Sequence, residues 1–189
     1  WQASDIHEDE TGVSFLLDRS ATPVGRIQGR VPGDYYVRNL TAAAAVTLQE
    51  GVPFEVIAGA ARRFRGAHRR FELVGEAGGV TVMDDYAHHP TEVRVTLAAA
   101  RRRFPGARLI GVHQPHTYSR ISYLWDEWRT CWRGLDALIV LETYAARETP
   151  EAGRSAQDLA AAITAPRAEY AADFDDAARL AAVAGARRR

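Results

Sequence analysis

A regular alternation of strand-like and helix-like segments begins after Gly66 and limits the chain to few folds. Strand patterns are expected at 71–74, 80–83, 108–112, 137–141 and near 168–170, with helix patterns at 91–104, 119–132, 156–163 and 175–184. Strands that alternate with helices of this length are typical of an α/β domain with a mainly parallel sheet. In such sheets ligands bind in the loops that follow the carboxyl ends of the strands. The alternation therefore also predicts where a site should lie.

The first 66 residues follow a different pattern. Strands are expected at 13–17 and 24–31, and helices at 36–50 and from Phe54 onward, with Gly66 ending the second helix. Two strands and two helices leave apolar faces with nothing to cover them. We therefore expect residues 1–66 to be the end of an incomplete domain, loosely packed on its own, and residues 67–189 to form a second domain.

Composition excludes several classes of protein. The 189 residues include 24 acidic and 24 basic residues, so bulk charge does not favour a nucleic-acid binder. The longest purely aliphatic run, 137–141, is far shorter than the roughly 20 apolar residues that a spanning helix needs. One cysteine, Cys131, permits no internal disulfide and fits a reducing, cytoplasmic location. The expected partners are small molecules, with no nucleic acid and no membrane, and the oligomeric state is left open.

All 24 basic residues are arginine. A phosphate-binding P-loop lysine, a Schiff-base lysine and a carbamylated lysine are therefore excluded within this chain. Any phosphate group must be bound by arginine, histidine or backbone amides.

Polar chemistry collects in two loops that follow expected strands. The first is DDYAHHPTE at 84–92 and the second is HQPHTYSR at 113–120, and together they hold four of the six histidines. Titratable groups concentrated at strand ends are typical of a binding or catalytic rim. Thr91 is also expected to cap the helix that follows the first loop.

Plainer interpretations fit the same residues. Four histidines suit zinc, although His88 and His89 are adjacent and no HExxH pattern is present. Asp84 and Asp85 could also be ordinary turn residues that cap the next helix. Arg69 and Arg70 could be a pair of solvated surface residues. Helical spacing favours core or interface packing for Trp125, Trp128 and Trp132, with Cys131 as a small buried side chain.

Four blocks of sequence share one pattern of motifs: FRGAHRRFE at 64–72, DDYAHHPTE at 84–92, HQPHTYSR at 113–120 and LETYAARETPEAGRS at 141–155, with a looser fifth block, GDYYVRNLTAAAAV, at 33–46. In this order they resemble the C-terminal part of the Mur ligases. The resemblance covers the chain from about Gly33 onward. The family member that recycles a murein tripeptide shares the first loop but differs at the second. The second loop of this chain, with Gln114-Pro115-His116 followed by Tyr118-Ser119-Arg120, is more similar to the family members that add alanine.

The resemblance implies a fold of three domains. The first binds the UDP-sugar, the second is a P-loop ATPase domain, and the third is a C-terminal Rossmann-like α/β domain. Residues 1–66 would end the central domain, and residues 67–189 would form most of the last one without its final strand. The implied reaction joins L-alanine to UDP-N-acetylmuramate through an acyl phosphate, with release of ADP and phosphate. ATP and Mg²⁺ are the implied cofactors, with the magnesium ligands in the absent part of the central domain. This C-terminal fragment is expected to be inactive alone.

The resemblance also implies roles for nucleotide-binding residues. Asp85 would hold the ATP ribose hydroxyls, Asn39 would contact the adenine edge, and Tyr86 would shape the adjoining wall. Arg70 would reach the ATP phosphates on closure and act in catalysis, because a planar cation offsets charge that develops during transfer.

A second set is implied for the amino-acid substrate. His88 or His89, together with Arg120, would face the incoming alanine as catalytic groups, and His116 would join His88 and Arg120 in binding it. Arg120 suits the alanine carboxylate because a guanidinium pairs with a carboxylate through two parallel hydrogen bonds. The implied mechanism is proximity and charge neutralisation, with no general base evident.

Some positions depart from the family pattern. Tyr35-Tyr36 stands where the family usually has His-Asn, Thr117 where it has arginine, and Ile121 where it has threonine. Loss of a cation near the substrate carboxylate would cost roughly 2–5 kcal/mol if the pair were buried. A non-catalytic nucleotide-binding or interaction module derived from a Mur ligase is therefore the alternative function.

Overall fold

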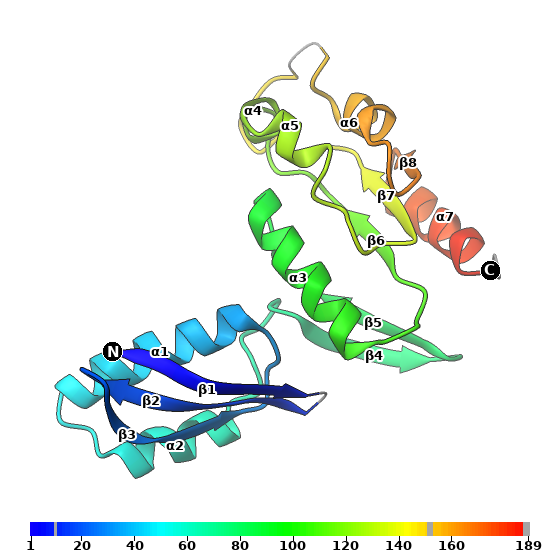
Figure 1. Ribbon diagram of the computed structural model, residues 1–189. Helices are drawn as coiled ribbons and strands as arrows, with labels where there is room; N and C mark the ends of the chain where they lie inside the picture. Colours follow the sequence, from blue (N-terminus) through cyan, green and yellow to red (C-terminus); the bar gives the residue numbers. More distant parts are fainter. Residues whose placement is uncertain (10, 151–152, 187–189) are drawn as a thin grey trace. The chain divides into compact units, whose positions relative to one another are not determined.

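The computed structural model describes residues 1–9, 11–150 and 153–186 (Figure 1). The chain divides into two compact units, Trp1–Tyr86 and Ala87–Arg189, and each is described by itself. Residues 67–86 thus group with the first unit, while the expected domain boundary at residue 66 stays a prediction. Within the described ranges, no helix is both long and apolar enough to cross a membrane.

An antiparallel sheet opens the first unit. Its strands are β1 (Gln2–Asp9), β2 (Gly12–Arg19) and β3 (Thr22–Gly29), in that spatial order. Side chains alternate along β2, so Val13, Phe15 and Leu17 share one buried face. The two-strand prediction missed β1, because this edge strand is mostly polar and exposed and has no apolar alternation to reveal it.

Two helices pack against the buried face of that sheet. They are α1 (Asp34–Gln49) and α2 (Phe54–Arg63), as the sequence pattern predicted. Tyr36 of α1 is buried in this core, where its ring stacks on Phe64 with 6.0 Å between centroids. Phe15, Leu17 and Ile27 have no exposed surface. The expectation of uncovered apolar faces was therefore wrong for this sheet, since the helices that follow it supply the cover.

A separate hairpin ends the first unit. Its strands, β4 (Glu72–Ala77) and β5 (Val80–Asp84), are antiparallel and joined through Gly78-Gly79. Both glycines have positive φ, 58° and 77°, as a tight hairpin turn requires. Such a short connection permits only antiparallel pairing. β5 therefore pairs with β4 and not within the parallel sheet that the alternation suggested.

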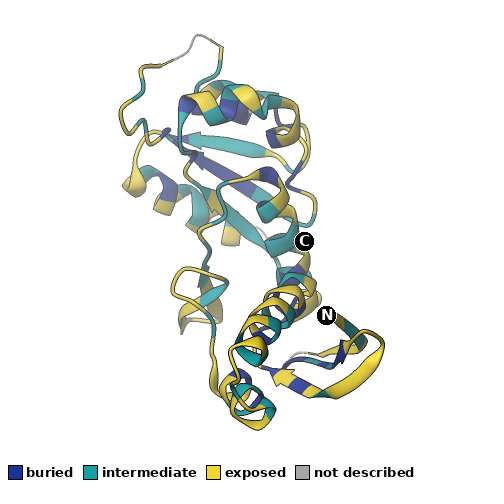
Figure 2. Ribbon diagram, turned by 90° about the vertical axis from the view of Figure 1, so that its left-hand side faces the viewer, coloured by how far each residue is buried: buried dark blue, intermediate teal, exposed yellow. Residues whose placement is uncertain are grey.

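The second unit contains the predicted parallel sheet. Its strands are β6 (Ile110–His113), β7 (Ala137–Leu141) and β8 (Ala168–Ala171), with β7 in the middle. Four of the five β7 residues are buried (Figure 2). The α/β class with a parallel sheet is confirmed.

Alternation along β7 sends its side chains into two cores. Leu138 and Val140 pack with residues of α3 (Pro90–Arg103) and α6 (Ala156–Ala162). Ile139 and Leu141 pack with residues of α7 (Phe174–Ala186). Helices therefore cover both faces of the sheet, which is why β7 reads as a continuous apolar run.

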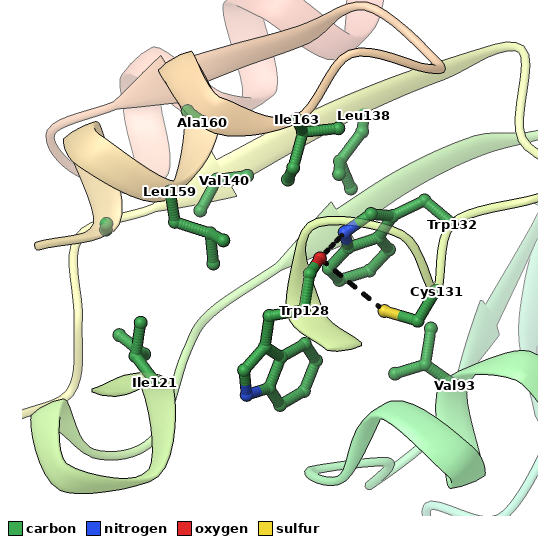
Figure 3. Packing of buried hydrophobic residues seen from close by; sticks show 11 residues of the cluster. Val93, Ile121, Trp128, Cys131, Trp132, Leu138, Val140, Leu159, Ala160 and Ile163 are labelled. Carbon is green, nitrogen blue, oxygen red and sulfur yellow. Dashed lines mark hydrogen bonds between the residues drawn. The ribbon is translucent and has the colours of Figure 1, made fainter. Parts of the chain in front are cut away.

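The helix expected at 119–132 is broken. The structure has α4 (Tyr118–Tyr123) and α5 (Trp125–Trp128), separated at Leu124, followed by turns. Trp128 and Trp132 are both buried in the core beside Cys131 (Figure 3). The indole Nε1 of Trp132 donates to the Trp128 carbonyl at 2.5 Å. The core role predicted for these residues is confirmed.

Candidate functional site

The end of β5 is tied to a turn at residues 69–71. The Arg69 Nε donates to an Asp84 carboxylate oxygen at 3.1 Å, and its guanidinium lies 4.7 Å from the centroid of the Tyr86 ring. Asp85 accepts a hydrogen bond from the Phe71 amide at 2.8 Å, and the Tyr86 amide donates to the Arg69 carbonyl at 2.7 Å. The two aspartates therefore hold this turn; they do not cap a helix.

The backbone of the same turn is unusual. Arg69 and Phe71 both have left-handed φ, 56° and 49°, which few residues other than glycine adopt. Such residues are found where the surroundings hold them in place, often at functional sites. The exposed Arg70 lies between them. The turn thus brings Arg70 next to residues that contact Asp85 and Tyr86, while Asn39 lies exposed on α1 of the same unit.

The two adjacent histidines shape the start of α3. His89 is the cap residue, and its Nδ1 accepts a hydrogen bond from the Thr91 amide at 3.2 Å. Pro90 opens the helix, where its missing N–H costs nothing. The prediction of Thr91 as the cap was therefore wrong by two residues. An accepting Nδ1 places the proton of a neutral His89 ring on Nε2.

His88 interacts with one carboxylate through two groups. Its backbone amide donates to Glu92 Oε2 at 2.9 Å, and its Nδ1 lies 3.5 Å from the same oxygen. The ring is only partly buried. Glu92, one helical turn away, thus holds the backbone of His88 at the start of α3.

The loops after β6 and β7 are joined at their bases. Tyr144 donates its amide to the Pro115 carbonyl at 2.9 Å, and its ring stacks on His116 with 5.2 Å between centroids and 14° between planes. Gln114 Nε2 donates to the Glu142 carbonyl at 3.3 Å. Arg120 Nη1 donates to the His116 carbonyl at 2.8 Å. His116 and Arg120 are therefore in direct contact, while their role in binding substrate stays a prediction.

Glu148 is a residue that the sequence analysis did not single out. Its carboxylate accepts hydrogen bonds from the Thr117 hydroxyl at 2.7 Å, the Ser119 amide at 2.8 Å and the Ser119 hydroxyl at 2.5 Å. These donors, Ser119 first, lower the pKa of Glu148 to about 2. The residue lies in the quoted 141–155 block, but its partners are 29 and 31 positions away. Nothing in the local sequence pattern indicates that contact. Residues 151 and 152 of that block lie outside the described part.

His113 is partly buried and packs against the core of the second unit. Its ring centroid lies 5.0 Å from those of both Trp128 and Trp132, and its Nε2 is buried without a hydrogen-bond partner in the described chain. Burial lowers the pKa of this ring to about 4. The four loop histidines thus have separate surroundings. Among described residues, no three His, Cys, Asp or Glu side chains cluster in a way that could hold a metal ion.

The predicted site residues divide between the two units. Arg70, Asp85 and Tyr86 gather at the end of β5, with Asn39 on α1. In the second unit His116 lies in the loop after β6 and Arg120 lies on α4, which follows that loop, while His88 and His89 directly precede α3. The first group offers a carboxylate, an exposed guanidinium and an aromatic ring. The second offers imidazoles and a guanidinium suited to a small carboxylate-bearing molecule.

Comparison with known proteins gives consistent matches. The family model described as "Mur ligase, glutamate ligase domain" matches residues 69–188. A UDP-N-acetylmuramate–L-alanine ligase of Roseiflexus sp. (strain RS-1) is 44% identical over 169 residues, which cover 86% of this chain and 36% of that protein. The enzyme of the same name from Cereibacter sphaeroides is 46% identical over 161 residues, covering 85% of this chain and 33% of that protein. The chain thus spans about a third of the length of these relatives.

A solved structure shows the same fold. The UDP-N-acetylmuramate–alanine ligase of Thermotoga maritima superposes with a TM-score of 0.77 at 20% sequence identity. The match covers 94% of this chain and 38% of that protein. Both units of the chain thus have counterparts in a known three-dimensional fold.

Proposed function

Because the chain belongs to the Mur ligase family, we propose that it is the C-terminal part of an ATP-dependent ligase that joins L-alanine to UDP-N-acetylmuramate. The identity of 44% with a relative of that name is the observation that carries the proposal. The chain contains part of the machinery, so the activity belongs to the longer protein. Its substrates, a UDP-sugar, an amino acid and ATP, fit a cytoplasmic location.

The end of β5 fits the ribose and phosphates of ATP. Asp85 is anchored by the Phe71 amide, which orients its carboxylate for hydrogen bonding to ribose hydroxyls. Arg70 projects from a turn whose neighbours are fixed, and its guanidinium suits phosphate oxygens. Tyr86 provides an exposed ring beside the same turn, and Asn39 supplies amide groups suited to an adenine edge. ATP supplies the phosphoryl group that activates the muramyl carboxylate for attack by the alanine amine.

No group of three or more His, Cys, Asp or Glu side chains among the described residues could hold a metal ion. Magnesium is usually held by one or two carboxylates together with substrate phosphates. We place its protein ligands outside this chain and assign no step to it here.

The loop after β6 fits the amino-acid substrate. Arg120 would pair with the alanine carboxylate, with His116 and His88 or His89 completing the wall around the small side chain. Arg120 already donates to the His116 carbonyl, which fixes part of its orientation. Such fixed positions support catalysis by proximity, since a held amine is near the atom that it attacks.

The departures from the family pattern have structural roles. Tyr36 is buried in the first core, and Thr117 donates to Glu148. Both side chains are therefore integrated into the fold. The alternative of a non-catalytic module gains no support from these contacts.

Two substitutions in the full-length protein test the assignment of the two groups. Asp85→Asn should raise the KM for ATP at least fivefold and leave the KM for L-alanine within twofold. Arg120→Ala should raise the KM for L-alanine at least fivefold and leave the KM for ATP within twofold, because it removes the partner of the amino-acid carboxylate. Arg129→Ala is the matched control, since Arg129 is an exposed arginine of the same unit, paired with Asp126. If Asp85→Asn and Arg120→Ala change both KM values equally, the division of roles is wrong.

A further inference from the structure

We propose that Glu148 is a positioning residue that holds the 114–117 loop and the first turn of α4 in the shape that presents His116 and Arg120 to the amino-acid substrate. This inference rests on the proposed ligase function and deepens it. Its basis is the set of contacts that Glu148 makes across two loops of the second unit.

Both carboxylate oxygens of Glu148 are used in this contact. Oε1 accepts from the hydroxyls of Thr117 and Ser119, and Oε2 accepts from the Ser119 amide at 2.8 Å. A carboxylate that accepts several hydrogen bonds from one short segment fixes the position and the orientation of that segment. Thr117 and Ser119 lie on either side of Tyr118, which is itself buried.

A short chain of contacts leads from Glu148 to the substrate-facing groups. Thr117 follows His116 directly, and the His116 carbonyl accepts the hydrogen bond from Arg120 Nη1 at 2.8 Å. Movement of the Thr117–Ser119 segment therefore moves the carbonyl that orients the guanidinium. It also moves the His116 ring relative to Tyr144, on which it stacks.

The other ties between the two loops lie nearer the sheet. The Tyr144 amide bonds to Pro115, and Gln114 bonds to the Glu142 carbonyl. These contacts fix the start of the loop. Glu148 fixes its far end, where the loop enters α4. Loss of Glu148 should therefore loosen residues 117–120 and leave β6 and β7 in place.

Glu148 remains ionised across the working pH range of most enzymes. The hydrogen bonds from Ser119 and Thr117 lower its pKa to about 2. The charged form that makes these contacts is thus present at any pH above about 3. A positioning role for this carboxylate should add no ionisation to the pH profile between pH 6 and pH 9.

Steady-state kinetics of the full-length protein test the proposal. Glu148→Ala should raise the KM for L-alanine at least fivefold, with the KM for ATP within twofold and the pH profile unchanged. Glu148→Gln keeps one accepting oxygen and should give an intermediate increase, of about twofold to threefold. Glu127→Ala is the matched control, because Glu127 is an exposed glutamate on α5 of the same unit.

Amide hydrogen exchange supplies a second readout that does not need activity. The Ser119 amide should exchange at least tenfold faster in Glu148→Ala, with the β7 amides unchanged. Equal increases in both KM values, or unchanged exchange at Ser119, would overturn the positioning role. A wild-type protein that makes no product with L-alanine overturns the proposed function instead, and the Ser119 exchange rate still decides whether Glu148 holds the loop.

Discussion

His113 illustrates how the surroundings of one side chain determine its chemistry. By sequence it belongs to the polar loop that begins at the end of β6, yet its ring packs against both Trp128 and Trp132. Burial lowers its pKa from 6.5 to about 4. At pH values between these two the unfolded chain binds a proton that the folded chain does not, so stability falls as the pH drops.

We therefore predict that His113 costs the protein about 2 kcal/mol of stability between pH 7 and pH 5. His113→Phe removes the titrating group. Between pH 7 and pH 5 the free energy of unfolding of this variant should therefore fall by about 2 kcal/mol less than that of the wild type. Urea unfolding followed by tryptophan fluorescence at both pH values measures the difference. Equal pH dependence in wild type and variant would show that His113 is protonated as readily in the folded protein as in the unfolded chain.

Tyr36 gives a second prediction. Its ring is buried against Phe64, but its hydroxyl is buried without a hydrogen-bond partner in the described chain, and burial raises its pKa to about 12. Tyr36→Phe removes an unsatisfied polar group and keeps the ring, so it should leave stability unchanged or raise it by up to about 1 kcal/mol. Tyr36→Ala should cost about 3–5 kcal/mol through the cavity that it leaves.

Thermal unfolding of the wild type, Tyr36→Phe and Tyr36→Ala measures both stability changes. A loss of more than about 1 kcal/mol in Tyr36→Phe would mean that the hydroxyl has a partner in solution. The sequence marked this position only as a departure from a family pattern. Its burial could not be predicted, because the facing residue, Phe64, comes from a later segment.

At the scale of elements, close approach of α1 to the sheet depends on Gly29. A Cβ at this position would lie 2.6 Å from Tyr36 Cε1 and 3.0 Å from Leu40 Cδ1. Gly29→Ala should therefore destabilise the first unit by about 1–3 kcal/mol, as overpacking does. Gly75→Ala on β4 is the control, since a Cβ there meets nothing within 4 Å. Chemical denaturation of the two variants makes the comparison, and equal losses would contradict a packing role for Gly29.

Elements with strong apolar periodicity were predictable, and weakly patterned ones were not. The alanine-rich run of α1, the three-to-four apolar spacing of α2 and the aliphatic run of β7 all gave elements close to those observed. β1 escaped prediction because an exposed polar edge strand is recognisable only by its partner, β2. The break between α4 and α5 also escaped, because residues 119–132 carry helical spacing without glycine or proline.

At the scale of the whole molecule, the α/β class and the gathering of polar groups in the strand-end loops could be inferred from sequence. The contact of Glu148 with Thr117 and Ser119 could not, since it joins residues 29 and 31 positions apart. Such contacts depend on how two loops meet at one edge of a sheet, which periodicity does not encode. The chain spans about a third of its relatives, 36% in the Roseiflexus enzyme.

We propose that the full-length protein adds L-alanine to UDP-N-acetylmuramate. The most direct test incubates the purified full-length protein with UDP-N-acetylmuramate, ATP, Mg²⁺ and L-alanine, and follows the products by mass spectrometry. We expect UDP-N-acetylmuramoyl-L-alanine to form with one ADP and one phosphate per amide bond, and no product when ATP is omitted. A folded protein that binds ATP but forms no amide with L-alanine, glycine or L-serine would contradict the claim and favour the non-catalytic module.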